Sequence, residues 1–450
     1  MSLLPWVDQL ASMSQRLGPG LARELAALVP PPVAPLAVEF PRPRVDDLDA
    51  TLAREFARPE IGGRLRPGAR VALLVGSRGI ARLPEIVRGV VRELRARGAS
   101  PYIVPAMGSH GGATAEGQAE VLAGYGITEA SVGAPIVSSL DVEVIGHAAD
   151  GVPVYASVDA LRADAIVPIA RIKPHTGFRG EIESGLMKML TIGLGKQRGA
   201  ETLHAQGMER FATLIPAAGE VVLARAPVAF GIAVVENAYE EIARLVAVPA
   251  ATFAETERAL LREARALMPQ LPFATIDLLV VGALGKNISG AGIDPNVVGR
   301  FFRGAPPGVE VRPEIRRIAV LDVTAESHGN SVGLGMADVI PLRLLQKTDL
   351  PSVYANSLTA ASLAGAKIPV VMESDRMAIA AGLKACPRVE PATARLCVIR
   401  NTLEIHEIWA SPPLVDEVAG RDGIRVRGPA RPLEFDADGN LVWPLAFTTK

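Results

Sequence analysis

The chain has 450 residues, more than one ordinary hydrophobic core accommodates, so two domains are expected. Lys and Arg together number 47 against 48 for Asp and Glu, and no dense basic run could neutralise a phosphate backbone, which argues against a nucleic-acid partner. The longest apolar run, residues 226–235, is about half of the roughly 20 residues that a membrane-spanning helix needs. Without a secretory signal or a cysteine framework, we expect a cytoplasmic protein with no membrane partner.

The first elements predict an α/β fold. Residues 30–43 are rich in proline and should form an extended lead-in after a short amphipathic helix. Residues 70–75 form a compact apolar run typical of a buried strand. Apolar residues at helical spacing begin at Leu83, and Gly98 supplies a left-handed stop. Residues 101–105 then give a second strand, so this unit should be a parallel strand–helix–strand crossover.

Further along, residues 141–157 show two alternating segments around 148–151, which predict a hairpin. Residues 165–169 are another buried strand, and residues 182–214 should form helical pieces interrupted by glycine. Thr252 and Glu255 fit a capping box before a strong helix that ends near Met268.

A domain boundary is expected after that helix. We predict an N-terminal domain over residues 1–270 that carries the cofactor site, and a C-terminal α/β domain over residues 271–450 that closes a cleft. Apolar runs at 276–281 and 318–323 are strands of the second domain. The predicted fold class is therefore α/β, with two domains, mixed and largely parallel sheets, and an active site in the cleft between them.

Five loops that follow predicted strands combine glycine with polar or charged residues: GSRG at 76–79, GSHGG at 108–112, RIKPHTGFRG at 171–180, GKNISG at 285–290 and ESHGN at 326–330. Ligands of open α/β sheets bind at the carboxyl ends of strands, so these loops could share one site. Three of the chain's six histidines, His110, His175 and His328, lie in them, and His204 follows shortly after.

The ordered motifs GSHGG, KPHTGFRGEIESGLMK and the later LH resemble those of the lactate racemase family. The resemblance implies that Lys188 carries a nickel-pincer nucleotide through a thioamide and that His204 is the protein ligand of nickel. It also implies that His110 and His175 are the acid/base pair. The family's maturation further implies cofactor-assembly enzymes as partners, and a homodimer is possible.

The chemistry of a 2-hydroxy acid supports such a set. Its α-hydrogen is far too weakly acidic for an imidazole near neutral pH to remove as a proton. A histidine can instead take the hydroxyl proton while the α-hydrogen leaves as hydride to a cationic ring, which gives a transient 2-keto acid. Two histidines suit the two enantiomers, and neutral imidazole is a good nickel ligand. We therefore expect a racemase or epimerase acting on a small 2-hydroxy carboxylate.

The remaining contacts are assigned to the same loops. Ser77, Arg78, Gly108, Arg179 and Gly180 are predicted to bind the cofactor. The substrate carboxylate needs cationic donors, for which Arg78, Lys173, Lys286 and the nearby Ser289 are candidates. The first loop lacks the Asp that the family places before an Arg, so Arg78 is the preferred equivalent and Arg82 the alternative.

Three other functions fit parts of the sequence. An NAD-dependent hydroxy-acid dehydrogenase shares the hydride chemistry, but no G-x-G-x-x-G follows the first strand. A serine hydrolase would use the G-x-S-x-G match around Ser331, which lacks the strand-to-helix setting of a nucleophile elbow. A non-catalytic protein could also bind an acidic or phosphorylated ligand through the same glycine loops.

Overall fold

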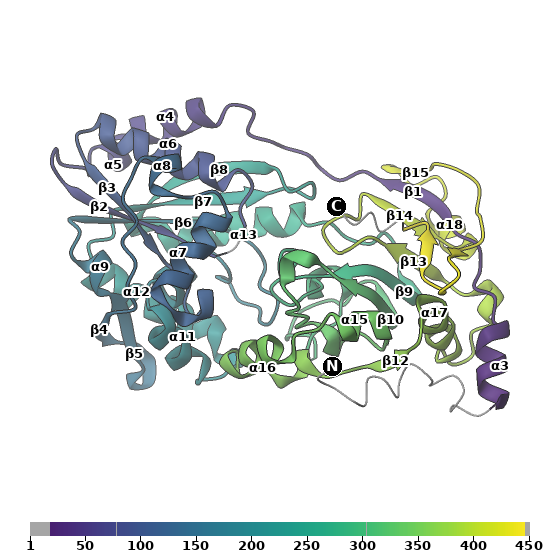
Figure 1. The fold of residues 1–450 in the computed structure, drawn as a ribbon. Coiled ribbons are helices and arrows are strands. Elements are labelled where there is room, and N and C mark those ends of the chain that lie inside the picture. The colour runs from purple at the N-terminus through teal and green to yellow at the C-terminus, as the bar shows by residue number, and fades with distance from the viewer. Residues whose placement is uncertain (1–18, 78, 303, 446–450) are drawn as a thin grey trace. The chain divides into compact units, whose positions relative to one another are not determined.

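The computed structural model describes residues 19–77, 79–302 and 304–445 (Figure 1). The chain divides into two compact units, one formed by residues 41–268 and the other by residues 269–450 together with the segment that ends at Phe40. We call them the 41–268 unit and the 269–450 unit. Each has its own sheet with helices around it, so the predicted α/β class is confirmed.

The 41–268 unit is built on a five-stranded sheet in the order β3-β2-β6-β7-β8. These strands are β3 (Ser100–Pro105), β2 (Arg70–Val75), β6 (Ala165–Arg171), β7 (Phe230–Glu236) and β8 (Ile242–Pro249). The first four run parallel and β8 pairs antiparallel with β7. The strands predicted at 70–75, 101–105 and 165–169 are thus confirmed, as is the parallel crossover from β2 to β3.

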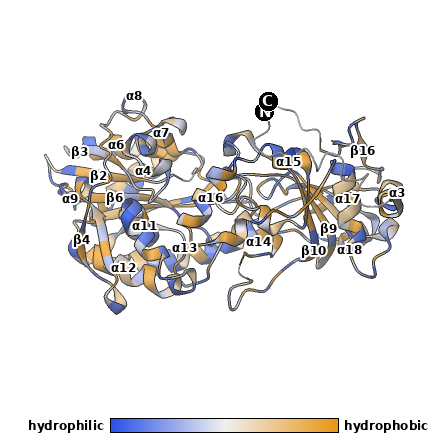
Figure 2. Ribbon diagram, turned by 60° about the horizontal axis from the view of Figure 1, so that its bottom comes forward, coloured by the Kyte–Doolittle hydropathy of each residue, from blue (hydrophilic) through white to orange (hydrophobic). Residues whose placement is uncertain are grey.

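Helices cover both faces of this sheet because the strands are apolar on both sides. Val71, Leu73 and Val75 pack with α4 (Leu48–Ala57) and α6 (Leu83–Ala96), whereas Ala72 and Leu74 belong to the opposite core. That second core is closed by α12 (Phe211–Arg225) and α13 (Phe253–Leu267). Figure 2 colours the ribbon by hydropathy, with apolar residues in orange. Strands covered by helices on both faces are expected to be apolar on both sides.

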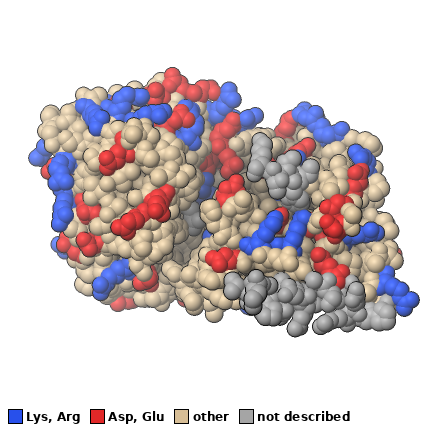
Figure 3. Space-filling view, viewed as in Figure 1, with Lys and Arg blue, Asp and Glu red and all other residues tan. Residues whose placement is uncertain are grey.

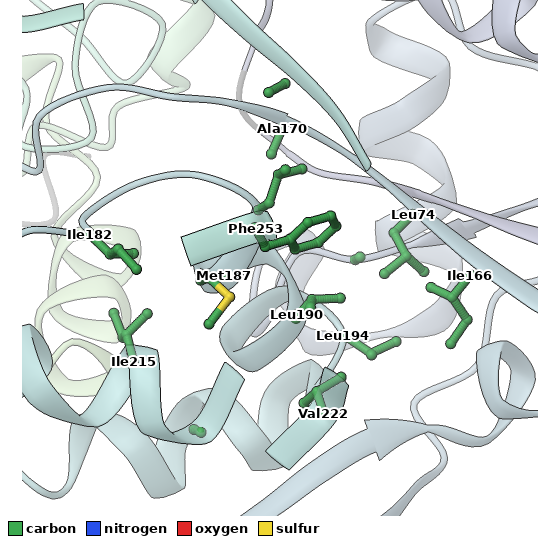
Figure 4. Packing of buried hydrophobic residues seen from close by; sticks show 14 of the residues in the cluster. Leu74, Ile166, Ala170, Ile182, Met187, Leu190, Leu194, Ile215, Val222 and Phe253 are labelled. Atoms are coloured by element: carbon green, nitrogen blue, oxygen red, sulfur yellow. The ribbon is translucent and has the colours of Figure 1, made fainter. Parts of the chain in front are cut away.

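The predicted hairpin is confirmed: β4 (Val142–His147) pairs antiparallel with β5 (Pro153–Ser157). The stretch predicted as helical pieces begins with α10 (Leu186–Lys188), a π-helical turn (Met189–Gly193) and α11 (Lys196–His204), and continues into α12. Figure 4 shows Met187, Leu190 and Leu194 of this stretch among buried side chains of the sheet and of α12. One side of the segment that carries Lys188 is therefore fixed by the core.

The predicted capping box at the start of α13 is wrong. Residues 250–252 already form a 3-10 turn, and Thr252 has φ −115° and ψ 13° with no side-chain cap bond. Its hydroxyl instead donates to the Pro249 carbonyl, 3.2 Å away. The preceding turn therefore takes the place that a side-chain cap would have at this helix start.

The 269–450 unit holds an eight-stranded sheet in the order β12-β11-β10-β9-β13-β14-β1-β15. Its strands are β12 (Val370–Met372), β11 (Val339–Pro341), β10 (Glu314–Val323), β9 (Thr275–Leu284), β13 (Leu396–Ile399), β14 (Glu407–Ala410), β1 (Ala34–Val38) and β15 (Ile424–Val426). Strands β12 to β13 run parallel, and β14, β1 and β15 follow antiparallel. The sheet is mixed and largely parallel, as predicted.

The lead-in segment belongs to this second sheet, which corrects the assignment of residues 34–38 to an N-terminal domain. Strand β1 lies between β14 and β15 and pairs antiparallel with both. The chain passes into the 41–268 unit after Phe40 and leaves it after Met268, close to the boundary expected at 270. Helix α3 (Pro19–Ala27) precedes β1, whereas residues 1–18 of the predicted first helix lie outside the described residues.

Within the described residues, none of the helices has both the length and the apolar character needed to cross a membrane. Lys and Arg side chains are interspersed with Asp and Glu over the face shown in Figure 3. This distribution agrees with the nearly balanced formal charge of the chain, −1.

Candidate active site

Three of the predicted loops leave the same edge of the five-stranded sheet. Loop 76–82 follows β2, loop 106–114 follows β3 and loop 172–185 follows β6. Because β3, β2 and β6 are neighbours and run parallel, their carboxyl ends lie side by side. The chain order also reverses around β2, since β3 lies on one side of it and β6 on the other. Such a switch point is where open α/β sheets bind ligands.

Loop 76–82 is held from two directions. The hydroxyl of Tyr125 donates to the Ser77 carbonyl at 2.8 Å, and the Ala81 amide donates to Glu236 Oε1 at 2.7 Å. The Ser77 hydroxyl hydrogen-bonds to Nδ1 of His110, so the first two loops are joined at the predicted acid/base residue. Arg78 lies outside the described residues. Arg82, its alternative, has φ 56° and pairs with Glu85 at 2.5 Å.

Loop 106–114 needs its glycines for close packing. Gly108 has φ +62°, and a Cβ there would lie 3.2 Å from the Cβ of Ala200 in α11. Gly111 has φ +68°, and its Cβ would lie 2.5 Å from the carbonyl carbon of Gly117. Both contacts bring the loop against helices, so His110 is held half-buried beside α11.

Loop 172–185 is organised by Glu183, a fully buried carboxylate that the sequence analysis did not single out. Its Oε2 accepts from the His175 amide at 2.5 Å and its Oε1 from the Gly180 amide at 3.1 Å. Arg265 of α13 donates to Oε1 at 2.5 Å, which balances the buried charge.

Two further contacts close the same loop. Lys173 and Ser184 exchange backbone hydrogen bonds of 3.1 and 3.3 Å at its base. The Arg179 guanidinium donates to the carbonyls of His175 and Phe178, at 2.6 and 3.0 Å. Arg179 and Gly180, both predicted to bind cofactor, thus hold the loop around His175 in this structure.

The ring of His175 is oriented by its own turn. The Gly177 amide donates to Nδ1 at 3.0 Å, so this nitrogen bears the lone pair and the proton of the neutral ring is on Nε2. His175 stacks on Phe178 with a centroid distance of 4.5 Å, Phe178 meets Phe211 at 5.6 Å, and Phe211 meets His204 at 5.1 Å. A continuous row of rings therefore links His175 to His204.

His204 is prepared as a neutral ligand. Its Nδ1 donates to the Ala200 carbonyl at 2.6 Å, so in the neutral ring Nε2 carries the lone pair. Burial lowers the pKa of His204, the bond to Ala200 opposes this, and the positive charge of Lys188 lowers it further. The His204 pKa therefore depends mainly on burial and only then on the charge of Lys188.

The short helix of Lys188 is anchored at its start by Glu257 of α13, a second carboxylate that the sequence analysis missed. Glu257 is buried, and its Oε2 accepts from the Met187 amide at 3.0 Å. Burial raises the pKa of Glu257 to about 7, against the lowering effect of the amides of Met187 and Leu186. On the other side, a Cβ on Gly76 would lie 2.9 Å from the methyl carbon of Met189. Loop 76–82 therefore packs next to Lys188.

Two predicted substrate residues lie in the 269–450 unit. The ammonium of Lys286 donates to the Gly290 carbonyl at 2.8 Å, and its backbone amide donates to Ser327 Oγ at 2.8 Å. Ser289 is buried, and its hydroxyl oxygen accepts from the Ala291 amide at 3.3 Å. Both roles remain predictions.

The serine of the G-x-S-x-G match is buried in the same unit. Ser331 Oγ contacts Thr348 Oγ1 at 3.0 Å, and the next element is a 3-10 turn, Leu334–Met336. A nucleophile elbow presents an exposed serine between a strand and a helix. The geometry therefore speaks against the serine-hydrolase reading.

Neither a protein-family model nor a curated protein sequence matches the chain. Among solved structures, it is similar to the lactate racemase apoprotein from Thermoanaerobacterium thermosaccharolyticum, with 12% identity and a TM-score of 0.48 over 83% of this chain and 99% of that one. It is also similar to a protein from Thermotoga maritima, with 14% identity and a TM-score of 0.47 over 62% and 71% of the two chains. At this level of similarity, the function has to be argued from the site residues.

Proposed function

We propose that the protein is a racemase or epimerase of a 2-hydroxy acid that works with a nickel-pincer nucleotide. The observation that carries the proposal is the bond of His204 Nδ1 to the Ala200 carbonyl, which leaves the Nε2 lone pair of the neutral ring for a metal, with burial lowering the pKa of the ring. His204 would then serve as the nickel ligand and Lys188 as the attachment lysine. His175 is connected to the same place through the row of rings.

The residues present fit this cofactor. Lys188 would carry it covalently and His204 would ligate its nickel through Nε2. Among the residues that the structure describes, no three His, Cys, Asp or Glu side chains gather as a metal-binding set, so the cofactor would supply most of the ligands. When bound, it supplies a hydride acceptor for the α-hydrogen of the substrate. Ser77, Gly108, Arg179 and Gly180, on the loops that follow β2, β3 and β6, would make the further contacts with it.

The chain's own acid/base groups would handle the hydroxyl proton. His110 lies on loop 106–114 and His175 on loop 172–185, and each would remove the proton from one enantiomer and return it to the other. In this structure His175 Nδ1 accepts from the Gly177 amide and Nε2 carries the proton of the neutral ring, so the ring would have to release that amide before it can accept the hydroxyl proton. Lys173, on the same loop, and Arg78 are the candidates in this unit for holding the carboxylate. The alternative of an NAD-dependent dehydrogenase would use the same proton transfer.

The experiment is intact mass and nickel content of the chain co-produced with cofactor-assembly enzymes. We expect a mass adduct at Lys188 and about one nickel per chain, the stoichiometry of a single cofactor. Lys188→Ala should lose the adduct, and His204→Ala should keep it but lose most of the nickel. His147→Ala, an exposed histidine on β4, is the matched control and should retain both.

Turnover is then measured on a panel of 2-hydroxy acids by loss of optical purity. His110→Ala and His175→Ala should each abolish racemisation while adduct and nickel remain, since neither residue is assigned to hold the cofactor. Wild-type protein without adduct and nickel after co-production would overturn the proposal and favour the dehydrogenase or a binding protein. Normal rates in both histidine variants would refute their acid/base roles.

A further inference from the structure

Lys196 occupies an unusual position for a lysine. It is 0% exposed, and as the first residue of α11 it has φ 53°, a left-handed conformation that few residues other than glycine adopt. A buried, strained residue persists only where its surroundings hold it, and such residues concentrate at functional sites. Burial lowers the pKa of Lys196 to about 8.

The Lys196 ammonium is bound to the base of loop 106–114. Its Nζ donates to the carbonyl of Pro105, the last residue of β3, at 2.5 Å. It also donates to Oε1 of Gln118 at 3.2 Å. Gln118 lies on α7 (Ala115–Gly124) and is likewise 0% exposed. Two fully buried polar side chains thus meet where β3 ends.

Gln118 passes the connection on to the loop itself. Its Nε2 donates to the Gly108 carbonyl at 2.9 Å and to the His110 carbonyl at 3.4 Å. The amide orientation is fixed, because Oε1 must accept from the lysine while Nε2 must donate to two carbonyls. The backbone around His110 is therefore bound through Gln118 and Lys196 to the first residue of α11.

The other end of α11 is His204. Helix α11 also touches the loop directly, through Ala200 against Gly108. A buried lysine is costly, and replacing a buried polar group by an apolar one of similar shape is often neutral or stabilising. What the apolar replacement would lose is the fixed spacing between loop 106–114 and α11.

We propose that Lys196 and Gln118 are positioning residues that hold the loop of His110 in register with the helix of His204. The inference rests on the proposed function, because the position of the loop matters for the rate only if His110 transfers the hydroxyl proton. Neither side chain would touch substrate or cofactor. Their contribution is to keep the His110 ring at a fixed place relative to the metal ligand, and a misplacement of about 1 Å in such a site can cost about 100-fold in rate.

The test compares Lys196→Met, Gln118→Met, Gln118→Glu and the Lys196→Met/Gln118→Met double variant with wild type, all as full-length chains. Gln118→Glu keeps an acceptor for Lys196 but removes the amide that donates to Gly108 and His110, so it should loosen the loop as Gln118→Met does. Gln197→Met is the control, because this neighbouring residue of α11 bonds along the helix surface to Glu201.

Amide exchange of the chain without cofactor is the first readout. We expect exchange in residues 106–114 to rise at least about 10-fold in both Gln118 variants and in the double variant, with β2 unchanged. In the loaded enzyme, kcat of the Lys196 and Gln118 variants should fall about 100-fold, with less than about a threefold change in KM. The adduct at Lys188 should remain in each of them. The double variant should be no slower than the slower single variant, because the two residues act as one unit.

The inference would be overturned if residues 106–114 of the Gln118 variants and the double variant exchanged as slowly as in wild type. It would also be overturned if kcat were unchanged in all Lys196 and Gln118 variants, even if their unfolding temperature changed. A loss of the adduct together with kcat would also overturn it, because the effect would then be on cofactor binding. If wild type itself racemises no 2-hydroxy acid, the proposed function fails, whereas the exchange comparison still decides whether Lys196 and Gln118 hold the loop.

Discussion

At the scale of single residues, the site depends on carboxylates buried next to backbone amides. Glu257 binds the Met187 amide at the start of the helix that carries Lys188, and its Oε1 is buried without a hydrogen-bond partner among the described residues. Ionising such a group costs free energy, which its pKa of about 7 expresses. Glu257, which holds the start of the helix of Lys188, therefore takes up a proton near neutral pH.

This predicts a pH dependence of stability. The folded state holds the Glu257 proton up to about pH 7, whereas the unfolded chain releases it near the ordinary value of 4.5, so stability should fall as pH rises between these values. In Glu257→Gln that component should vanish, a difference on the order of 3 kcal/mol over the window. Urea unfolding at pH 5 and pH 8 measures it. Glu263→Gln is the control, because Glu263 lies on the same helix in a partly exposed ion pair with Arg244, and its stability should depend on pH as that of wild type does. The same pH dependence of stability in Glu257→Gln and wild type would refute the prediction.

A second residue-level prediction concerns the tautomer of His204. If Nδ1 donates to Ala200, the neutral ring should show the Nε2 lone pair in nitrogen NMR of the unloaded chain, and burial should hold its pKa below the ordinary histidine value of 6.5. Lys188→Met should raise the His204 pKa, because a nearby positive charge is removed. A pKa that does not move, or that moves downward, would show that the two side chains are not electrostatically coupled.

At the scale of elements, loop 172–185 behaves as a closed unit around Glu183. The carboxylate accepts hydrogen bonds from backbone amides of the loop and from Arg265 of α13. Removing it would leave those amides and a guanidinium without their partner. The conformation of His175 thus depends on a side chain that takes no part in the reaction.

Glu183→Ala should therefore lower the free energy of unfolding by about 3 to 5 kcal/mol, the usual cost of breaking a buried ion pair. Residues 174–184 should also become the first site of proteolytic cleavage. Glu181→Ala is a matched control two residues away, because Glu181 is 78% exposed and its pair with Arg258 should contribute less than about 1 kcal/mol. Equal effects of the two substitutions on the urea midpoint would contradict this role.

The sequence predicted the strands that carry these loops, because β2, β3 and β6 are short apolar runs with turn signals directly behind them. It did not predict Glu183, Gln118 or Lys196, since their partners are remote in sequence or are backbone groups that carry no side-chain signal. Glu257 could have been recognised from its position in the sequence. It lies four residues after Phe253 and four before Leu261, on the buried face of α13. A charged residue at an apolar position of a helix is a signal that could have identified it.

At the scale of the whole molecule, the proposed catalytic machinery is concentrated in the 41–268 unit. His110, His175, Lys188 and His204 all belong to it, and both of its hydrophobic cores are drawn from residues within its limits. A unit with its own sheet, cores and helical cover on both faces has what an independent domain needs.

Residues 41–268 expressed alone should accordingly unfold in one cooperative transition and protect the amides of β2 and β6 from exchange. A shorter chain, residues 70–268, is the control. It lacks α4, whose Leu52 and Phe56 are buried in the core on one face of the sheet, and should be less stable by several kcal/mol. Absence of a cooperative transition in the longer chain would show that the 269–450 unit is needed for folding.

Strand β1 has a consequence for the order in which the protein is made. Ala34 pairs with Ala410, so the strand must wait until 376 further residues have been added, roughly 20 to 75 seconds at 5–20 residues per second. The whole 41–268 unit is synthesised during that interval, while an apolar strand stays without its neighbours. Prolines at 30–32 precede it and Pro35 lies within it, and a residue without an amide proton cannot template pairing with another chain. The proline-rich lead-in should therefore limit pairing of this strand with other chains until its own sheet exists.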